Sequence, residues 1–472
     1  MNKFYITNAI PYVNAKPHIG HAMEFVQSDA IARFHKQIGD DVLLLCGADE
    51  NAIKNVQAAE QEKITIRQLV DKNSKLFEDL ARKLNVKFDV FQRGSDAKHH
   101  SSSQKLWGLC NKNGDIYKKQ YAGLYCVGCE LFYERAELNE NGECFEHPGK
   151  KLEKISEENY FFKLSKYQKE IEEILKSNKI KIVPENRKNE ALSFVKEGLK
   201  DISISRSNIR AKNWGVSVPN DPDQKMYVWF DALNIYRSGA LDWWPADLHV
   251  IGKGILRFHA IYWPAFLLSA GLSLPKSIFV HEYITVNGQK ISKTLGNVID
   301  PIELINKYGS DPLRYYLLRS ISPFADGDFS KEKFEEIYNA DLANGLGNLI
   351  SRVTKLCENS NYVQMGSQSR VSGHLISIED YSDAISQFRF NDALSFIWKK
   401  IAALDKFIND EKPWDLLKAA DKRLRSVLAH SVDQIQEIAA LLEPFLPETA
   451  QKIEDQFKGP KIVSQKPLFP RL

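Results

Sequence analysis

The apolar run VLLLC at Val42–Cys46 stands between two helical patterns, and a shorter run, FYI at Phe4–Ile6, precedes the first of them, which extends over Ala22–Ile38. Short apolar runs that alternate with helices are typical of parallel strands covered on both faces. The same alternation returns over His249–Val280. The sequence therefore predicts an α/β fold in which one parallel sheet is split by an insertion.

The rest of the chain divides around this split sheet. We expect its two halves in residues 1–115 and 213–282, the insertion in residues 116–212 and a smaller segment in residues 283–336. From residue 337 to residue 472 the pattern is only helical, because apolar residues recur every three to four positions. This last region is predicted to be an all-α bundle.

Composition restricts the class of protein. The 472 residues are 43% hydrophobic and 26% charged, which excludes a largely disordered chain. With 64 basic and 61 acidic residues the formal charge is only +3, so any nucleic acid must be bound locally. Polar Thr7 and Asn8 interrupt the first apolar run, and polar residues interrupt Phe258–Leu274. We therefore expect neither a secretory signal nor a membrane span.

Six cysteines in a chain of this length do not form a disulfide framework, and three of them lie in the pattern Cys126-x2-Cys129-x14-Cys144-x2-His147. Thiolate and imidazole ligands at this spacing suit one tetrahedral Zn²⁺, and four protein ligands make the ion structural. Two reduced cysteine pairs without metal are the alternative. Reduced cysteines favour a cytoplasmic enzyme. Because no further domain is predicted after the bundle, we expect a monomer.

The segment His18-Ile19-Gly20-His21 is predicted to lie where the first strand passes into the first helix. This is the edge of an open α/β sheet at which ligands bind. The two histidines would stand beside backbone amides that favour phosphate, and Gly20 would leave bare backbone against which an adenine or ribose packs. A histidine pair alone is more often structural.

A second motif, Lys290-Ile291-Ser292-Lys293-Thr294, is expected in a loop after the last strand. Lys290 and Lys293 could neutralise the charge that builds on the α-phosphate of ATP and on departing pyrophosphate. An ordinary exposed loop would explain the lysines alone. Two such motifs at opposite ends of one split sheet favour ATP chemistry.

The two motifs resemble the HIGH and KMSKS signatures of class I aminoacyl-tRNA synthetases. Further segments look like the methionyl branch of that family: Ala9–His18, Gly47–Glu50, Gly123–Cys126, Tyr160–Phe162, Tyr227–Leu233 and Leu295–Val298. The resemblance covers essentially the whole chain. It implies a split Rossmann-type nucleotide-binding sheet, a zinc-bearing connective insertion and a C-terminal α-helical anticodon-binding domain.

The resemblance also implies roles for single residues. ATP would be bound by His18, Gly20, His21, Glu24, Lys290 and Lys293. Of these, the two histidines and the two lysines would be catalytic. Methionine would be bound through its ammonium group and its thioether by Asp49, Ile10, Tyr12, Trp229, Tyr236, Ile255 and His259. Taken singly, Trp229 and Tyr236 are more often core aromatics, and Glu24 would complement the helix dipole.

Four residues of the bundle match the anticodon readers of the family. Asn348 and Arg352 lie four positions apart on one predicted helix face, from which they could bond to base edges. Pro413 and Trp414 begin another predicted helix and supply a plane for base stacking. Each feature alone is also explained by an exposed helix face or a proline helix start. Their joint occurrence favours RNA recognition.

The implied reaction joins L-methionine to tRNA(Met) with ATP and Mg²⁺, through an adenylate, and releases AMP and pyrophosphate. A cysteinyl-tRNA synthetase, a nucleotidyltransferase that shares the first motif, and an inactive tRNA-binding module are the alternatives. Three residues depart from the family pattern near the site, since Asn51 and Ala52 replace histidine and glycine, and Gly254 stands where an aspartate is common. Ile291 and Thr294 replace methionine and serine in the second motif but keep its chemistry.

Overall fold

Six strands form the main sheet in the order β3-β2-β1-β12-β13-β7, and every neighbouring pair is parallel. The computed structural model describes residues 2–145, 149–290, 297–364 and 378–472. The strands of the main sheet are β1 Lys3–Asn8, β2 Asp41–Ala48, β3 Val90–Arg93, β7 Lys181–Val183, β12 Leu248–Gly252 and β13 Ser277–His281. The predicted α/β fold with a parallel sheet is confirmed, because strands from two distant parts of the chain share one sheet.

The edge strand β7 comes from the middle of residues 116–212. Its residues Lys181–Val183 pair with Ser277–Phe279 of β13. The segment between the two halves of the sheet is therefore not a separate body, because it returns to complete the sheet before the chain continues to β12.

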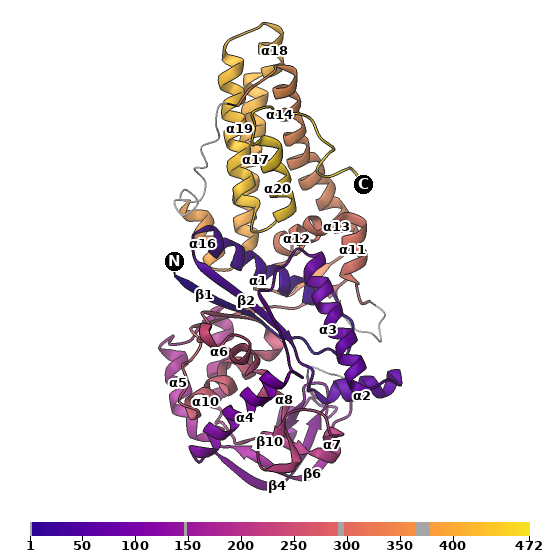
Figure 1. Ribbon diagram of the computed structural model, residues 1–472, viewed down its shortest axis with the longest axis vertical. Helices are drawn as coiled ribbons and strands as arrows, with labels where there is room; N and C mark the ends of the chain where they lie inside the picture. The colour runs from indigo at the N-terminus through magenta and orange to yellow at the C-terminus, as the bar shows by residue number, and fades with distance from the viewer. Residues whose placement is uncertain (1, 146–148, 291–296, 365–377) are drawn as a thin grey trace.

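Helix α1 (Ile19–Gln37) lies between the main sheet and the C-terminal helices (Figure 1). Apolar residues such as Ala22, Val26 and Ala30 are buried along it. His18 caps its first turn, and basic His35 and Lys36 in its last turn complement the helix dipole. The helices that follow in the first part of the chain are α2 Ile53–Glu62, α3 Ile66–Lys83 and α4 Ala97–Lys112.

The insertion is built on a four-stranded antiparallel sheet in the order β5-β4-β6-β8. Its long central hairpin curves across the end of the molecule opposite the bundle (Figure 1). The elements of this region are β4 Ile116–Cys126, β5 Leu131–Tyr133, η1 Arg135–Glu137, β6 Glu153–Phe162, η2 Leu164–Tyr167, α5 Gln168–Lys176, α6 Glu185–Lys196 and β8 Ile202–Ser203.

A small antiparallel sheet and several short helices connect the insertion to β12 and β13. They are β9 Ser205–Ser207, α7 Asn208–Ala211, β10 Ser217–Val218, β11 Asp221–Met226, α8 Val228–Ala232, α9 Ile235–Ser238, η3 Leu241–Trp243, η4 Lys253–Ile255, η5 Phe258–Tyr262 and α10 Trp263–Ser269. The sequence predicts one helix over Ile255–Leu268, whereas η5 is a π-helix. Pro264 has no N–H for the carbonyl of Ala260, and the wider turn accommodates it.

A third small sheet, in the order β15-β14-β16, follows β13. It consists of β14 Ile284–Val286, β15 Gln289–Lys290 and β16 Gly327–Phe329. Helices α11 Pro301–Tyr308 and α12 Ser310–Arg319 lie between β15 and β16, and α13 Lys331–Ile337 follows β16. The predicted helical C-terminal region is confirmed. Its helices are η6 Tyr338–Gly347, α14 Asn348–Asn359, α16 Glu379–Ser386, α17 Phe390–Glu411, α18 Pro413–Lys418, α19 Arg423–Leu442 and α20 Pro447–Phe457.

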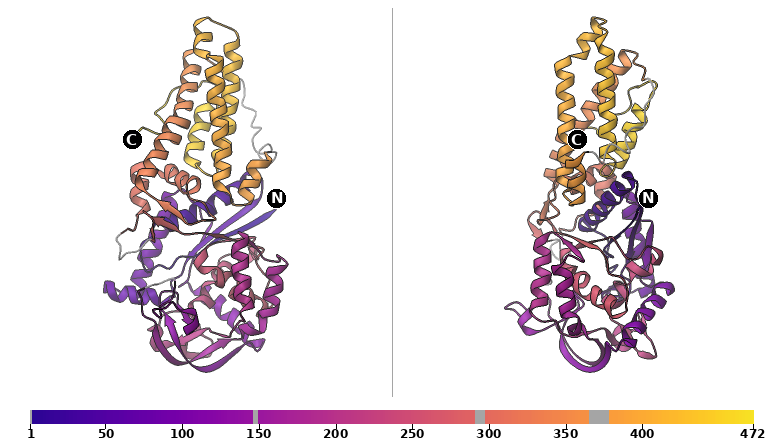
Figure 2. Two further views of the ribbon diagram at one scale, coloured as in Figure 1. Left: turned by 180° about the vertical axis from the view of Figure 1, so that it is seen from behind. Right: turned by 90° about the vertical axis from the view of Figure 1, so that its left-hand side faces the viewer.

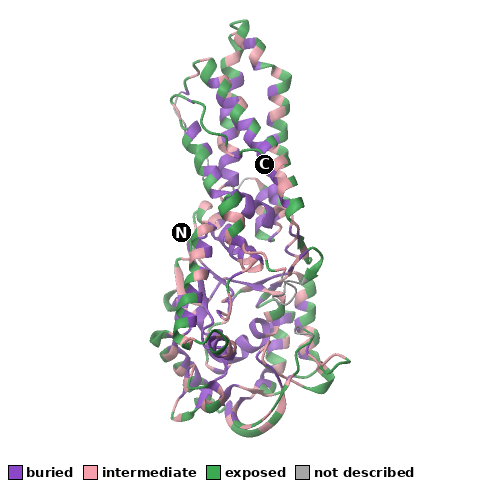
Figure 3. Ribbon diagram, turned by 90° about the vertical axis from the view of Figure 1, so that its right-hand side faces the viewer, coloured by how far each residue is buried: buried purple, intermediate pink, exposed green. Residues whose placement is uncertain are grey.

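The main sheet separates two hydrophobic cores. Ile6 of β1 belongs to the core that continues into the C-terminal helices, while the adjacent Tyr5 belongs to the core shared with the insertion. Figure 2 shows the long helical part rising from the α/β part in two further views, and Figure 3 shows buried residues running through both parts. Within the described ranges, no helix has both the length and the apolar character needed to cross a bilayer.

Candidate active site

The first motif forms the N-terminal cap of α1. The Nδ1 atom of His18 accepts a hydrogen bond of 3.1 Å from the backbone N–H of Gly20. The backbone N–H of His18 in turn donates to Nδ1 of His21 over 3.1 Å. The centroids of the two imidazole rings are 3.9 Å apart. Because both Nδ1 atoms accept, a neutral ring at either position carries its proton on Nε2 and can donate from there.

Burial determines the charge of these rings. Desolvation lowers the pKa of His18 to about 4. It lowers the pKa of His21 well below its ordinary value, and the neighbouring His18 contributes in the same direction. At neutral pH both rings are uncharged. The pair therefore offers two N–H donors to an oxyanion rather than two cations.

Gly20 lies against the His18 ring and beside β14. A Cβ atom at this position would lie 3.0 Å from Cε1 of His18 and 3.6 Å from Cγ2 of Ile284. Ile284 begins β14, and Thr285 of that strand pairs with Lys290 in β15. The hairpin that carries the start of the second motif thus packs against the first motif. Lys293 lies outside the described residues, as does the side chain of Lys290.

Glu24 follows the first motif by one helical turn and is held from two sides. Its Oε1 accepts a hydrogen bond of 2.7 Å from Nδ2 of Asn8 at the end of β1. Its Oε2 lies 2.9 Å from Nε2 of His281 at the end of β13. Both partners come from strand ends at the edge of the sheet where α1 begins.

The predicted methionine-pocket residues come together beside this edge. The Tyr236 hydroxyl lies 2.8 Å from Nε2 of His259, whose Nδ1 lies 2.9 Å from the Ile255 carbonyl. Burial lowers the pKa of His259 to about 4, so the neutral ring donates to this carbonyl and accepts from the hydroxyl. Trp229 lies edge-on to Tyr12, with ring centroids 6.1 Å apart, and 6.4 Å from His259.

Ile10 lies close to the same strand edge. A Cβ atom at Gly47, near the end of β2, would approach Cγ2 of Ile10 to 3.2 Å. Trp229 also stacks on Phe258 at 3.7 Å, a contact that the sequence analysis did not include. Aromatic and apolar side chains, which suit an unbranched thioether, thus lie close to one another here.

Asp49 lies at the end of β2 and is 3% exposed. It pairs with Tyr12 in an isolated parallel bridge, and its N–H donates to the Pro11 carbonyl over 2.9 Å. Burial raises the pKa of its carboxyl well above the ordinary value, and the carboxylates of Asp231 and Glu130 add to this effect. A bound ammonium group would reverse this shift by favouring the charged form.

Sequence reasoning missed several charged residues around Asp49. The Nζ atom of Lys54 lies 3.6 Å from the centroid of the Tyr12 ring, and burial lowers its pKa. Arg206, 3% exposed, forms an ion pair of 3.1 Å with fully buried Glu130. Glu130 also accepts the Lys54 backbone N–H over 3.3 Å. The position of Glu130 directly after Cys129 was the only feature of the local sequence that indicated a role for it. The residues that it contacts are distant in the sequence.

The departures near Asp49 are accommodated by other contacts. Nδ2 of Asn51 donates to Oδ2 of Asp231 over 2.6 Å and to the Gly94 carbonyl over 2.8 Å. Ala52, which is fully buried, precedes α2 and provides no side-chain cap. Gly254 lies in η4. The adjacent Lys253 pairs with two carboxylates, those of Glu282 at 2.8 Å and Asp326 at 2.6 Å.

The three predicted cysteine ligands converge. Their sulfur atoms all lie within 4.8 Å of one another. The distance to Sγ of Cys144 is 3.2 Å from Cys126 and 3.7 Å from Cys129. Tetrahedral zinc with bonds of about 2.3 Å requires sulfur atoms about 3.8 Å apart, so the donor set fits a metal ion. His147 lies outside the described residues.

The bundle brings two of its four predicted readers together. The Arg352 guanidinium lies 5.9 Å from the Trp414 ring centroid. It also donates to Asp405 over 2.5 Å and to Asn409 over 2.7 Å, both on α17. Pro413 begins α18, and Asn348 is exposed at the start of α14.

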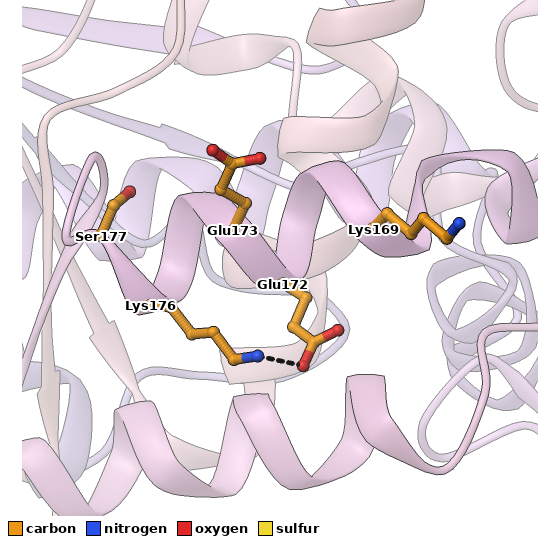
Figure 4. Close-up of a pocket in the computed structure, with 5 residues that line it drawn as sticks. All are labelled: Lys169, Glu172, Glu173, Lys176 and Ser177. Atoms are coloured by element: carbon orange, nitrogen blue, oxygen red, sulfur yellow. Dashed lines mark ion pairs between the residues drawn. The ribbon is translucent and has the colours of Figure 1, made fainter.

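A separate hollow of about 450 Å³ lies along α5, on the surface of the insertion (Figure 4). It is lined by Lys169, Glu172, Glu173, Lys176 and Ser177. Lys176 and Glu172 form an ion pair of 2.6 Å, as expected for a solvated helix face. None of the lining residues belongs to the predicted site.

Comparisons with known proteins identify the family of the chain. A family model described as tRNA synthetases class I (M) matches residues 4–354. The methionine–tRNA ligase of Brucella melitensis biotype 1 is 41% identical over 97% of this chain and 92% of its own length. The methionine–tRNA ligase of Thermotoga maritima is also 41% identical, over 96% of this chain and 74% of its own length.

Two solved structures extend the likeness to the fold. Mycobacterium tuberculosis methionyl-tRNA synthetase in complex with methionyl-adenylate superposes with a TM-score of 0.92 at 37% identity, with 100% of both chains covered. The free form of that enzyme gives a TM-score of 0.83 at 35% identity, with 100% of this chain and 98% of that chain covered. These matches decide against the cysteinyl and nucleotidyltransferase alternatives. The chain therefore belongs to the methionyl-tRNA synthetases, a family of class I tRNA synthetases.

Proposed function

We propose that this chain activates L-methionine with ATP and transfers it to tRNA(Met), using the residues that converge at the carboxyl edge of the main sheet. The observation that carries this proposal is the packing of β14 against Gly20, which brings the hairpin leading to Lys290 onto the histidine pair. The buried carboxyl group of Asp49 and the aromatic cluster of Tyr12, Trp229 and His259 come from neighbouring parts of the same α/β region. Activation of an amino acid needs a phosphate site and an ammonium site within reach of each other.

In the first step, the methionine carboxylate attacks the α-phosphorus of ATP and pyrophosphate leaves. His18 and His21 donate from Nε2 to phosphate oxygens, since burial keeps both rings neutral. Lys290 and Lys293 supply the positive charge that neutral imidazoles do not. Gly20 and Glu24 bind the adenosine side, and Mg²⁺ enters with the ATP phosphates.

Asp49 binds the methionine ammonium group, which leaves the substrate carboxylate free to attack. The thioether lies among Ile10, Tyr12, Trp229, Tyr236, Ile255 and His259. Neutral His259 accepts the hydrogen bond of the Tyr236 hydroxyl. The hydroxyl therefore needs no water molecule as a partner among the apolar side chains.

In the second step, the terminal ribose hydroxyl of tRNA attacks the adenylate, and AMP leaves. No covalent enzyme intermediate is required, so catalysis depends on positioning. Arg352 and Trp414 recognise anticodon bases by hydrogen bonding and stacking, with Asn348 and Pro413 beside them. Asp405 and Asn409 hold the guanidinium in place before RNA arrives.

We further propose a structural Zn²⁺ held by Cys126, Cys129 and Cys144, with His147 as the fourth ligand. When bound, the ion contributes folding energy to the insertion rather than chemistry to the reaction. In this assignment residues 1–115 and 213–282 form the Rossmann-type domain. Residues 116–212 form the connective insertion, which also contributes β7 to the main sheet. Residues 283–336 carry the lysine loop, and residues 337–472 form the anticodon-binding domain.

The test is amino-acid-dependent exchange of pyrophosphate into ATP, measured with each of the twenty amino acids, followed by charging of tRNA(Met). We expect exchange with methionine and charging of this tRNA. Exchange driven by cysteine, or exchange with no amino acid, would reject the proposal. Methionine-dependent exchange without charging would limit the chain to adenylate formation.

A further inference from the structure

His281, the last residue of β13, lies between two oxygen acceptors. Its Nε2 is 2.9 Å from Oε2 of Glu24, and its Nδ1 is 2.9 Å from the backbone carbonyl of Glu282. Each ring nitrogen thus has an oxygen partner, one on α1 and one in the backbone of its own strand end. The contact with Glu24 joins the ring to a carboxylate and is a charge-assisted hydrogen bond.

The ring has little freedom to leave this position. The side chain of His281 is 7% exposed, and that of Glu24 is 13% exposed. Gly252 stands opposite His281 in the parallel pairing of β12 with β13. A Cβ atom at Gly252 would lie 3.4 Å from Cε1 of the ring. The backbone at the end of β12 therefore lies close to the imidazole.

The Glu24 carboxylate is clamped through its second oxygen as well. Nδ2 of Asn8 donates to Oε1 over 2.7 Å, and Ser28 donates to Oδ1 of Asn8 over 2.8 Å. Two strand ends, those of β1 and β13, therefore fix the orientation of one carboxylate on α1. Removing either donor would leave a partly desolvated charge with one partner fewer.

The position of His281 connects both signature motifs. Its side chain reaches Glu24, three residues after His21 on the same helix. Its backbone continues through Ile284 of β14 into the hairpin that carries Lys290. A displacement of His281 would therefore alter the carboxylate near the first motif and the start of the second motif together.

We propose that His281 is a positioning residue for the nucleotide, which it serves by fixing the Glu24 carboxylate while ATP binds. This inference rests on the proposed role of Glu24 on the adenosine side. It assigns His281 no contact with ATP. It requires that loss of the imidazole weaken ATP binding and leave methionine binding unchanged, because the methionine pocket shares none of these hydrogen bonds.

The experiment compares H281A and H281Q with the unaltered full-length chain in methionine-dependent pyrophosphate exchange. We expect H281A to raise KM for ATP by about tenfold, the size of effect expected when one charge-assisted hydrogen bond is lost. KM for methionine should stay within about twofold of the unaltered value. H281Q retains an N–H donor and should recover part of the loss. An increase of both KM values by the same factor, or no increase for ATP, would overturn the proposal.

A matched control lies on the same helix. His35 forms a comparable pair with Asp40, with Nδ1 to Oδ2 at 2.8 Å, but at the far end of α1. H35N should leave both KM values unchanged. If H35N raises KM for ATP as much as H281A does, the effect reflects general loosening of the helix, and the positioning role is wrong.

Two measurements separate this inference from the proposed function. A double-mutant cycle of H281A with E24Q should show strong non-additivity in kcat/KM for ATP, whereas additive effects would contradict the proposal. Complete absence of methionine-dependent exchange in the unaltered chain would instead reject the proposed function. Direct calorimetric titration of ATP into H281A would still test His281 in that case.

Discussion

The predicted methionine pocket and the predicted anticodon surface of the bundle differ in how their polar side chains are bonded. Around the methionine pocket, the Tyr12 hydroxyl, Trp229 Nε1 and Asp231 Oδ1 are buried without hydrogen-bond partners among the described residues. In the bundle, the Arg352 guanidinium is bonded to both Asp405 and Asn409 near the surface. The predicted pocket therefore contains polar groups without protein partners, whereas the Arg352 guanidinium of the bundle is already bonded to protein.

This difference predicts where a substitution acts. Removing a buried charge near the pocket should have large effects on activation and on stability, and these effects should be of opposite sign. Changes on the bundle surface should affect only the RNA-dependent step. The four predictions below test this contrast, beginning with the largest expected effect.

Replacing Asp49 with asparagine should give the largest effect. D49N removes the partner of the substrate ammonium group, so kcat/KM for methionine should fall about 10³-fold. The same change should stabilise the free protein, because burial raises the pKa of Asp49 and makes its ionised form unfavourable in the folded state. A group with a raised folded-state pKa costs stability as pH rises above its unfolded value. The gain in Tm should therefore be larger at pH 8 than at pH 5.

Asp71 provides the control for the sign of this pH dependence. Its side chain is 45% exposed. Burial alone would raise its pKa, but hydrogen bonding to Arg93 lowers it overall. D71N should therefore lose a little stability at neutral pH and none in acid. A D49N protein that is less stable than the unaltered chain at pH 8 would contradict our account of the pocket.

Removal of metal should have the next largest effect and should be local. Chelation should lower Tm and should speed amide exchange in β4, β5 and β6, because the cysteine cluster joins the hairpin ends of this sheet. C144S should reproduce the exchange pattern. C357S, which alters a buried cysteine of α14 outside the cluster, should not. Chelation without any change in these strands would argue against a structural ion.

Replacement of Trp414 should act on the RNA step alone. W414A should lower kcat/KM for tRNA(Met) about 10- to 100-fold, the equivalent of one lost base stack of ~1–3 kcal/mol. Pyrophosphate exchange should remain unchanged, because Trp414 lies at the opposite end of the molecule from the pocket. W398F, which alters a bundle tryptophan stacked on Tyr315, serves as the control and should charge tRNA normally. A fall in pyrophosphate exchange with W414A would contradict our prediction that the bundle surface affects only the RNA-dependent step.

The smallest effect should come from Asn51. N51A removes a hydrogen bond to Asp231 and one to the Gly94 carbonyl, so kcat/KM for methionine should fall about fivefold. N51H restores the residue common in the family and should change it less than about twofold. Steady-state exchange kinetics of both variants would measure this. Equal losses with N51A and N51H would mean that shape, rather than the bond to Asp231, governs the position.

The sequence predicted the elements whose signal is periodic and local. Strands β1, β2 and β13 and helix α1 appear within a few residues of their expected bounds. Their apolar runs and helical patterns involve only neighbouring residues, so the sequence alone indicates them. β7 was not predicted, since three residues inside a charged segment carry no periodic signal. The π-helix η5 was missed for a similar reason, because only the neighbouring Pro264 marks it.

The site was predictable only where its residues belong to recognisable motifs. The positions of His18, Asp49 and Cys126 follow from such motifs. Lys54, Arg206 and Asp231 were missed because they approach Asp49 and Glu130 only after folding has brought α2, β9 and α8 together. Single charged residues far apart in a sequence have no spacing from which a shared buried site can be inferred. The same limitation applied to His281, whose partner lies 257 positions away.

Helix α1 is a continuous rod of 19 residues, about 28 Å long. His18 caps one end, while at the other end Arg33 bonds to Glu443 and Gln37 bonds to the Ala440 carbonyl of α19. The helix therefore connects the base of the bundle directly to the imidazoles of the first motif. A tilt of about 3° at its far end moves the tip by about 1.5 Å. Displacements of that size are enough to spoil an aligned attack, so a tilt of α1 at the bundle would change the geometry where bonds are made.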